Sequence, residues 1–281
     1  MIFDIGRPLI MAHRGESGNI PENTILALEA ALKIGVDVLE SDIRFTKDDI
    51  PVLFHDDDLE RTTGVTGTVR EKTLDDLLQI DLGHSFTTDN GETYPFREKG
   101  LKIVTLEQAL NRFQDTILNL DIKDTFPKAP VEVARVLRET QRTEKIMIAS
   151  FHPRQLERFR ENAPEIPTSA HPTEIRNFVL GVKMRALGLF VRSLPYKAFQ
   201  VPERSGSIQV VTPRFVKAAH DRDLAVHVWT INEREDMERL LDMEVDGIFT
   251  DYPAILREVL IERGHLLSEK GSTRRKSTEI A

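Results

Sequence analysis

Residues 37–55 read DVLESDIRFTKDDIPVLFH, which is two apolar runs joined by a polar turn. In the first run Glu40 and Asp42 share one face, because successive side chains of a β-strand point to opposite faces. The second run, Pro51–His55, begins about seven residues after the first ends, whereas a parallel crossover needs a dozen or more residues. We therefore expect a strand followed by an antiparallel hairpin arm, with residues 46–49 as the turn.

On both sides of this stretch, short apolar runs alternate with segments of helical period, a rhythm typical of βαβ units around a parallel sheet. Eight runs are predicted strands: Pro8–His13, Asp37–Ile43, Thr116–Ile122, Ile146–Ser150, Ile166–Ala170, Ala198–Pro202, Ala225–Thr230 and Gly247–Thr250. The predicted fold class is therefore α/β, and the predicted architecture is a (β/α)8 TIM barrel. A stretch rich in Thr, Gly and Asp, about 57–100, is expected to form a small insertion after the hairpin arm, over the barrel mouth and without a core of its own.

Several predicted helices have recognisable starts. Thr105 and Gln108 form the pattern of a capping box ahead of an apolar helical face. Asn232 and Glu235 repeat this pattern later in the chain. Proline in the first turn is predicted to open three further helices, at Pro153, Pro213 and Pro253.

The length and the two ends of the chain suggest one domain. A chain of 281 residues can bury one sizeable core, so residues 1–264 are predicted to form one catalytic domain, and the polar, basic residues 265–281 a flexible tail. The first residues lack a basic segment followed by an apolar run, so we expect no secretory signal. The absence of cysteine excludes disulfides and thiolate chemistry, and it fits a reducing, cytoplasmic setting.

Charge and apolar content restrict the partners. The formal net charge of −8 argues against nucleic acid, which needs a basic face, so a small molecule is the expected partner. The most apolar window, Phe178–Val191, is 14 residues long and contains Lys183 and Arg185, so it is too short and too charged to span a bilayer. We expect a buried helix there, and a helix in weak contact with a membrane surface is the alternative. No pattern indicates an oligomeric state.

Active sites of TIM barrels lie at the C-terminal ends of the strands. Two predicted strand ends bring three carboxylates to that mouth: Glu40, Asp42 and Asp121. These carboxylates would repel one another unless a cation lay between them, and a hard divalent ion, Mg²⁺ or Ca²⁺, suits oxygen ligands. The alternative is a closed cluster of ion pairs with Arg14, Arg44 and Lys123.

Other polar side chains are predicted at the same mouth. His13 ends the first strand and His55 ends the hairpin arm, and two imidazoles can divide general acid–base work near neutral pH. Either ring can be the acid. Arg14 and Lys123 would stabilise negative charge on a phosphoryl group, so a phosphate ester is the expected substrate class. Trp229 is either a wall of the pocket or a core aromatic.

In their order and spacing these residues resemble the glycerophosphodiester phosphodiesterase family. The resemblance runs from about Leu9 to Leu260, and its pieces are AHRG (12–15), PENT (21–24), GVDVLESDI (35–43), TKD (46–48), PVLFHD (51–56), LERTT (59–63), NLDIK (119–123), VWTIN (228–232) and DGIFTDYP (246–253). It implies metal-dependent hydrolysis of glycerophosphodiesters to sn-glycerol 3-phosphate and an alcohol. It also implies the same roles for the site residues: an acid–base pair in His13 and His55, metal ligands in Glu40 and Asp42, and phosphate contacts in Arg14 and Lys123.

Two positions depart from the family's pattern. The third metal ligand is usually a glutamate and is Asp121 here, one methylene shorter, which bears on metal distance and preference. Asp49 stands in place of the glycine usual after Thr-Lys-Asp, and a turn with positive φ would accommodate it less easily.

Several alternatives stay open at this point. The nucleophile is water or a neighbouring hydroxyl of the substrate. An enzyme of the same fold acting on lysophospholipids, a lysophospholipase D, would need an exposed apolar surface at residues 178–191. An inactive phosphodiester-binding module is the third possibility, although the histidine pair and the acidic set are both present.

Overall fold

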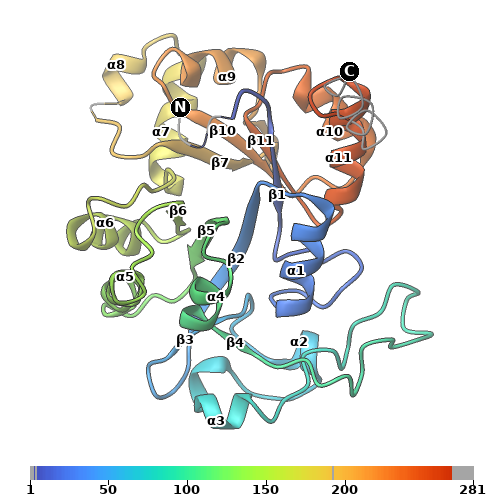
Figure 1. Cartoon of the computed structure of the whole chain (residues 1–281). Helices are drawn as coiled ribbons and strands as arrows, with labels where there is room; N and C mark the ends of the chain where they lie inside the picture. The colour runs from blue at the N-terminus through green and yellow to red at the C-terminus, as the bar shows by residue number, and fades with distance from the viewer. Residues whose placement is uncertain (1–2, 4, 192, 268–281) are drawn as a thin grey trace, which may run out of the picture.

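The computed structural model describes residues 3, 5–191 and 193–267, and its main strands form a barrel (Figure 1). β1 (Leu9–Ala12) pairs in parallel with β2 (Val38–Phe45) on one side and with β11 (Gly247–Thr250) on the other. On the β2 side, parallel pairing continues to β5 (Ile117–Ile122) and then to β6 (Ile146–Ala149). On the β11 side, it continues to β10 (Ala225–Trp229) and then to β7 (Ala198–Pro202).

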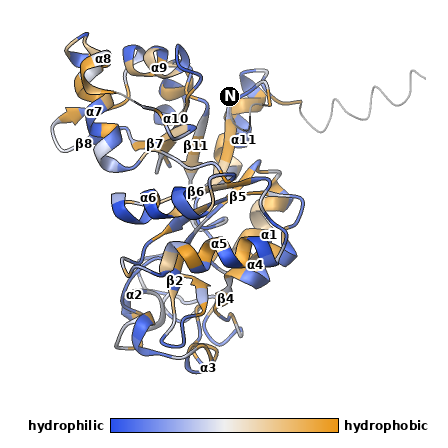
Figure 2. Cartoon of the chain, turned by 90° about the vertical axis from the view of Figure 1, so that its left-hand side faces the viewer, coloured by the Kyte–Doolittle hydropathy of each residue, from blue (hydrophilic) through white to orange (hydrophobic). Residues whose placement is uncertain are grey.

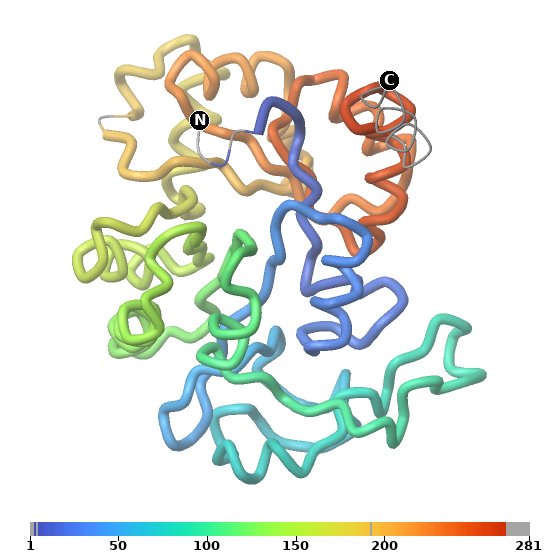
Figure 3. Tube along the Cα trace, viewed as in Figure 1, coloured from blue at the N-terminus to red at the C-terminus, as the bar shows by residue number. Residues whose placement is uncertain are grey.

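The fifth predicted strand, residues 166–170, contributes only two isolated bridges. Thr168 bridges Ile148 of β6, and Ser169 bridges Ala198 of β7, both in parallel. The barrel closes through this extended segment, which confirms the (β/α)8 TIM barrel but shortens its fifth strand. Figure 3 traces the chain along this path, from the blue first strand to the red last helix.

The predicted hairpin arm is confirmed. β3 (Pro51–Leu53) pairs antiparallel with β2, and β4 (Val104–Thr105) extends this edge of the sheet. Asp49 in the turn has a φ of 63°, in the left-handed region that favours glycine. Its carboxylate accepts a hydrogen bond from the Arg70 guanidinium at 2.5 Å, so the insertion helps to hold the turn.

The helices cover the outside of the barrel. Their bounds are α1 (Ile25–Ile34), α4 (Leu106–Arg112), α5 (Ala129–Glu139), α6 (Pro153–Asn162), α7 (Pro172–Lys183), α8 (Leu187–Phe190), α9 (Pro213–His220), α10 (Arg234–Leu241) and α11 (Pro253–Glu262). The capping box of Thr105 with Gln108 is confirmed, as are the prolines that open α6, α9 and α11. The cap predicted at Asn232 is wrong: α10 begins after Glu233, and the Asn232 side-chain oxygen accepts the backbone N–H of Asp251 instead.

The insertion after the hairpin arm contains α2 (Glu60–Thr63), the 3-10 turn η1 (Val69–Glu71) and α3 (Leu74–Leu77). The expectation that it lacks a core is wrong, because it shares a separate apolar cluster with the hairpin arm: Val52, Phe54, Leu59, Val69, Leu77, Leu82 and Ile103. Such a satellite cluster fixes a long connecting segment to the domain. A second, smaller hairpin of β8 (Arg204–Ser205) and β9 (Ile208–Gln209) follows β7.

Alternate side chains of each strand face two different cores. On β2, Leu39 and Ile43 pack outward with the helices, whereas Val38 joins an inner cluster. Because side chains alternate along the strand, Glu40 and Asp42 point to the same inner side as Val38, and both line the cavity at the barrel mouth. The predicted shared face is therefore confirmed.

His227 is a fully buried histidine in the middle of β10. Its exposed fraction is 0%, and neither ring nitrogen has a hydrogen-bond partner within the described part of the chain. Burial lowers the pKa of His227 from 6.5 to about 4, so the ring is neutral in the folded protein. In the unfolded chain the ring gains its proton near pH 6.5. The stability that depends on a neutral ring is therefore complete above this pH and is lost as the pH falls toward 4.

We expect His227→Leu to remove part of the acid sensitivity of the fold. Between pH 7 and about pH 4.5, protonation of the unfolded chain at this ring alone removes about 2–3 kcal/mol of stability. Urea unfolding gives the free energy of unfolding at each of the two pH values. The decrease of this free energy from the higher to the lower pH should be smaller by that amount in His227→Leu than in wild type. The exposed His265→Leu is the control and should follow wild type. Equal acid losses in wild type and His227→Leu would contradict a neutral, unpaired ring.

Candidate active site

A cavity of about 520 Å³ opens at the C-terminal ends of the barrel strands. The structure brings all the predicted site residues to its lining: His13, Arg14, Glu40, Asp42, His55, Asp121, Lys123 and Trp229. Trp229 is thus part of the pocket wall, where its ring lies 5.6 Å from that of Phe151 between centroids.

The part of the cavity wall that comes from α7 and the β8–β9 hairpin is largely apolar, with Val179, Leu180 and Ile208 among its side chains. None of residues 57–100, all of which the structure describes, lines the cavity. The insertion therefore lies beside the mouth instead of over it, and α7 is the element placed to contact the part of a substrate that extends from the mouth.

Acidic side chains of two neighbouring strands lie side by side. In the parallel register of β2 and β5, Asp42 is the partner of Asp121. The Lys123 ammonium lies between them, with Nζ 3.0 Å from Asp42 Oδ1 and 2.7 Å from Asp121 Oδ2. Arg14 adds a second cation, with Nε 3.0 Å from Asp42 Oδ2. The ion pairs predicted as the alternative to a cation site are thus present for Arg14 and Lys123. Arg44 instead pairs with Asp57 and Asp124.

Burial and charge shift the pKa values in this cluster. Burial raises the pKa of Glu40 to about 7, and the neighbouring Asp42 carboxylate adds to the rise. Burial acts in the same direction on Asp42, but Lys123 and Arg14 outweigh it and hold the pKa of this carboxyl well below its usual range. Burial lowers the pKa of Lys123, but Asp121 and Asp42 outweigh it, so its pKa is raised. Further positive charge beside Glu40 would therefore be favourable.

The carboxylates can be tested as ligands of a cation. In the described residues, no three His, Cys, Asp or Glu side chains are grouped closely enough to hold a metal ion as they stand. Asp121 Oδ1, however, is buried and has no hydrogen-bond partner among those residues, and a buried oxygen is costly to leave unpaired. Together with Glu40 and Asp42 it makes an all-carboxylate donor set, which suits a hard divalent cation once the Lys123 ammonium shifts from between the two aspartates.

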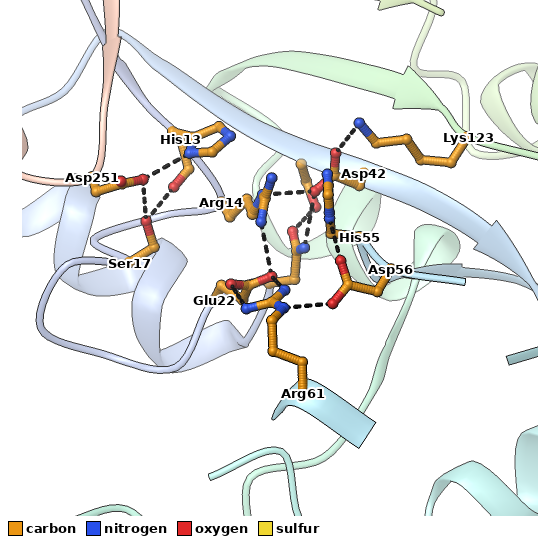
Figure 4. A network of polar contacts seen from close by, with 12 residues as sticks. His13, Arg14, Ser17, Glu22, Asp42, His55, Asp56, Arg61, Lys123 and Asp251 are labelled. Carbon is orange, nitrogen blue, oxygen red and sulfur yellow. Dashed lines mark hydrogen bonds and ion pairs between the residues drawn. The ribbon is translucent and has the colours of Figure 1, made fainter. Parts of the chain in front are cut away.

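His13 is held by a carboxylate that follows the last strand. Its Nδ1 lies 2.7 Å from Asp251 Oδ1, and the Ser17 hydroxyl contacts both the His13 carbonyl and the same Asp251 oxygen (Figure 4). The Asn232 amide donates to Asp251 Oδ2 at 2.7 Å. Burial lowers the pKa of His13, but the hydrogen bond to Asp251 and the charge of Glu40 outweigh it, so the pKa is raised. Because Nδ1 is engaged, Nε2 is the ring nitrogen left for a substrate.

His55 has a corresponding arrangement on the other side of the mouth. Its Nδ1 lies 2.6 Å from Asp56 Oδ1, and Arg61 of α2 links Asp56 to Glu22 (Figure 4). Burial is the main cause that lowers the pKa of His55. The pKa values of the two rings thus move in opposite directions, as suits a pair in which one ring carries a proton that the other lacks.

Sequence reasoning missed the residues that hold the two rings. Asp251 directly follows the last residue of β11, as His13 follows β1, so the rule that singled out His13 could have found it. Asn232 was assigned to a helix cap, and Arg61 lies in the insertion, whose position a residue pattern does not fix. Asp56 stands in the PVLFHD segment (51–56) of the family resemblance, but no role was predicted for it.

Comparisons with known proteins identify the family of the chain. Residues 13–255 match the model of the Glycerophosphoryl diester phosphodiesterase family. A glycerophosphodiester phosphodiesterase of Bacillus subtilis (strain 168) is 32% identical over 266 residues, which cover 90% of this chain and 86% of that protein. One of Bacillus altitudinis is 30% identical over 248 residues, which cover 87% of this chain and 94% of that protein.

Solved structures show the same fold. An Oleispira antarctica phosphodiesterase in complex with the product sn-glycerol-3-phosphate is 25% identical, with a TM-score of 0.74, and the match covers 90% of this chain and 97% of that one. A putative glycerophosphoryl diester phosphodiesterase from Silicibacter pomeroyi DSS-3 is also 25% identical, with a TM-score of 0.74 and coverage of 93% and 95%.

Proposed function

The chain belongs to the glycerophosphoryl diester phosphodiesterase family, and on this premise we propose that it hydrolyses glycerophosphodiesters to sn-glycerol 3-phosphate and an alcohol by metal-assisted acid–base catalysis. It is a phosphoric diester hydrolase. The observation that carries the proposed mechanism is the pair of imidazoles in one cavity, each held through Nδ1 by a carboxylate and placed beside an acidic cluster.

His13 and His55 divide the proton transfers. One Nε2 takes a proton from the attacking hydroxyl, and the other donates a proton to the oxygen of the departing alcohol, so that no free alkoxide is released when the P–O bond breaks. Asp251 and Asp56 hold the rings in the tautomer and orientation that leave Nε2 available. The attacking group is water, or a free glycerol hydroxyl of the substrate, in which case a cyclic phosphate forms first.

Arg14 and Lys123 bind the phosphate. Charge-assisted hydrogen bonds from these side chains stabilise the negative charge that grows on the nonbridging oxygens, and they are strong where water is largely excluded. The carboxylates of Glu22 and Asp42 already orient the Arg14 guanidinium, and Asp42 and Asp121 orient the Lys123 ammonium. Arg14 is thus positioned before substrate arrives, whereas the Lys123 ammonium reaches the phosphate when it leaves its place between the two aspartates.

Glu40, Asp42 and Asp121 would hold a divalent cation, Mg²⁺ or Ca²⁺. When bound, such an ion polarises a nonbridging phosphate oxygen and offsets charge in the transition state. Asp121 supports this assignment because its Oδ1 has no other partner in the described chain. Glu40 supports it because its raised pKa reflects burial beside a second carboxylate.

The direct test measures release of sn-glycerol 3-phosphate from glycerophosphocholine and glycerophosphoethanolamine, each with Mg²⁺, Ca²⁺ or EDTA. We expect turnover that requires a divalent ion and stops on addition of EDTA. Turnover that persists in EDTA would overturn the role of the cation. No turnover under any condition would overturn the hydrolase mechanism and favour the phosphodiester-binding module.

A second candidate, hydrolysis of lysophospholipids in the manner of a lysophospholipase D, is favoured by the apolar cavity wall. Val179, Leu180 and Ile208 lie where an acyl chain attached to the substrate could pack. Lysophosphatidylcholine added to the same assay distinguishes the two functions. Turnover of the lysolipid alone would assign the lysophospholipase D activity, and turnover of the glycerol diesters alone would exclude it.

Asp251→Asn is expected to lower kcat by about 10²-fold with little change in KM, because an amide keeps the shape of the carboxylate but not its charge or its hold on the His13 ring. The charge of Asp251 contributes to the raised pKa of His13, so the limb of the pH–rate profile that belongs to His13 should move to lower pH. Asp246→Asn is the control, because it breaks a similar pair with His220 outside the cavity. An unmoved pH–rate profile would contradict a positioning role for Asp251.

A further inference from the structure

We propose that this chain docks on anionic lipid surfaces through the face that adjoins the apolar wall of its active-site cavity. The α7–α8 face, as we call it, consists of the exposed side chains of α7, α8, the segment between them and the β8–β9 hairpin. The proposal does not depend on the reaction mechanism, because its anchoring side chains lie outside the catalytic cluster.

Apolar side chains are exposed together on the α7–α8 face. Leu189 is 80% exposed and Met184 is 63% exposed, and Leu180 and Ile208 are 40% and 46% exposed. Leu180 and Ile208 also line the active-site cavity, so its apolar wall continues onto the surface. An exposed apolar patch of this kind next to a binding cavity marks an interaction site.

The fold itself holds these side chains outward. α8 packs closely on α7 at Gly181, where an added Cβ would lie 3.0 Å from the Leu187 backbone. Leu187 and Val191 pack against the core, which leaves Leu189 on the other side of this short helix. The expectation of one buried helix over 178–191 is therefore wrong for its second half. Figure 2 shows α7, α8 and β8 together at the upper left edge of the molecule, far from the insertion.

The α7–α8 face is basic in a chain whose net charge is −8. Residues 175–202 contain no Asp or Glu. The exposed basic side chains of α7 and of the segment after it are Arg176, Lys183 and Arg185, and none of the three has an ion-pair partner within the described residues. Unpaired cations around an apolar patch complement a surface that is both anionic and apolar.

The two carboxylates that flank residues 175–202 in the chain are both ion-paired. Glu174 pairs with Arg160 and Glu203 with Arg239, each at 2.8 Å. Within the described residues no helix is long and apolar enough to cross a membrane, so contact through this face would be at the bilayer surface. A bilayer that contains anionic lipids supplies the negative head groups for the basic side chains and a shallow apolar layer for Met184 and Leu189.

Sedimentation with vesicles of phosphatidylcholine, with and without phosphatidylglycerol, tests this proposal. Wild type is expected to sediment with the phosphatidylglycerol vesicles at low ionic strength and to be released by added salt, which screens the attraction. Two variants outside the cavity lining separate the contributions: Met184→Ser/Leu189→Ser removes the apolar anchors, and Arg185→Glu reverses one charge. Each is expected to weaken partition onto the vesicles by about tenfold.

Matched changes in α1 serve as controls: Leu26→Ser at an apolar side chain that is 38% exposed, and Lys33→Glu with the same charge reversal. Both should sediment like wild type. Every variant should hydrolyse soluble glycerophosphocholine at the wild-type rate, so a failure of docking is distinguishable from a failure of the proposed reaction.

Two results would overturn the proposal: wild type that stays in the supernatant with both kinds of vesicle, or Met184→Ser/Leu189→Ser and Arg185→Glu variants that sediment like wild type. Self-association of wild type that the Met184→Ser/Leu189→Ser variant abolishes, without vesicle binding, would instead assign the α7–α8 face to a second copy of the chain.

Discussion

Replacement of His13 by alanine is expected to lower kcat for glycerophosphocholine hydrolysis by about 10³-fold or more. The His13 ring lines the cavity, and its orientation is fixed by Asp251, so its loss removes a positioned proton donor or acceptor. His55→Ala is expected to give a loss of similar size. The double variant should be only slightly worse than either single one, because the two rings act in the same catalytic event.

His220→Ala is the matched control for this prediction. His220 also pairs with an aspartate, with Nε2 2.8 Å from Asp246 Oδ2, but it lies outside the cavity lining. This variant should keep wild-type kcat, and thermal unfolding should show that all the variants are folded at the assay temperature. If His13→Ala lost no more activity than His220→Ala, the acid–base assignment would be wrong.

The sequence predicted the barrel well because its strands are short apolar runs separated by helical segments. β7 and β11 have the predicted bounds, and most other strands differ from the prediction only at their ends. The rule that chemistry lies at the C-terminal ends of barrel strands then placed Glu40, Asp42 and Lys123 at one mouth, where the structure has them. Strand periodicity is a local property, so a single sequence contains it.

Contacts between distant segments could not be predicted in the same way. Asp251 reaches His13 across 238 positions of the chain, and the pattern around each residue says nothing about that distance in space. The apolar cluster that the insertion shares with Val52 likewise depends on contacts between distant segments, so it was not expected. Residues 178–191 read as one apolar segment, although Gly181 lets the chain fold back and expose Leu189.

The acidic cluster shows a limit of a different kind. The sequence allowed either a cation site or a closed set of ion pairs, and the structure contains features of both. Lys123 pairs with Asp42 and Asp121, yet Asp121 Oδ1 has no hydrogen-bond partner among the described residues. The structure places the predicted residues together at the barrel mouth, but the function of the cluster depends on where the Lys123 ammonium lies when substrate and cation are bound. Only a change that affects the two functions differently can separate them.

The substitution Asp42→Asn can separate a cation site from an ion-pair network. We expect it to lower kcat/KM by about 10³-fold and to weaken binding of the divalent cation, as measured by calorimetry. The amide keeps the size of the side chain but removes the charge that compensates Arg14 and Lys123 and that would ligate the cation. Both cations keep one other carboxylate partner, so the free energy of unfolding in EDTA should fall by about 3 kcal/mol, near the lower end for breaking a buried pair.

Asp124→Asn provides the matched control, because Asp124 is also buried and ion-paired, with Arg44 at 2.9 Å, but does not line the cavity. It should lose a comparable amount of stability and keep activity at temperatures where it is folded. Asp121→Glu restores the longer side chain usual in the family and should retain activity within about tenfold. If Asp42→Asn matched Asp124→Asn in both stability and activity, the cluster would be a structural ion-pair network, because a carboxylate that ligates a catalytic cation cannot be neutralised without loss of turnover.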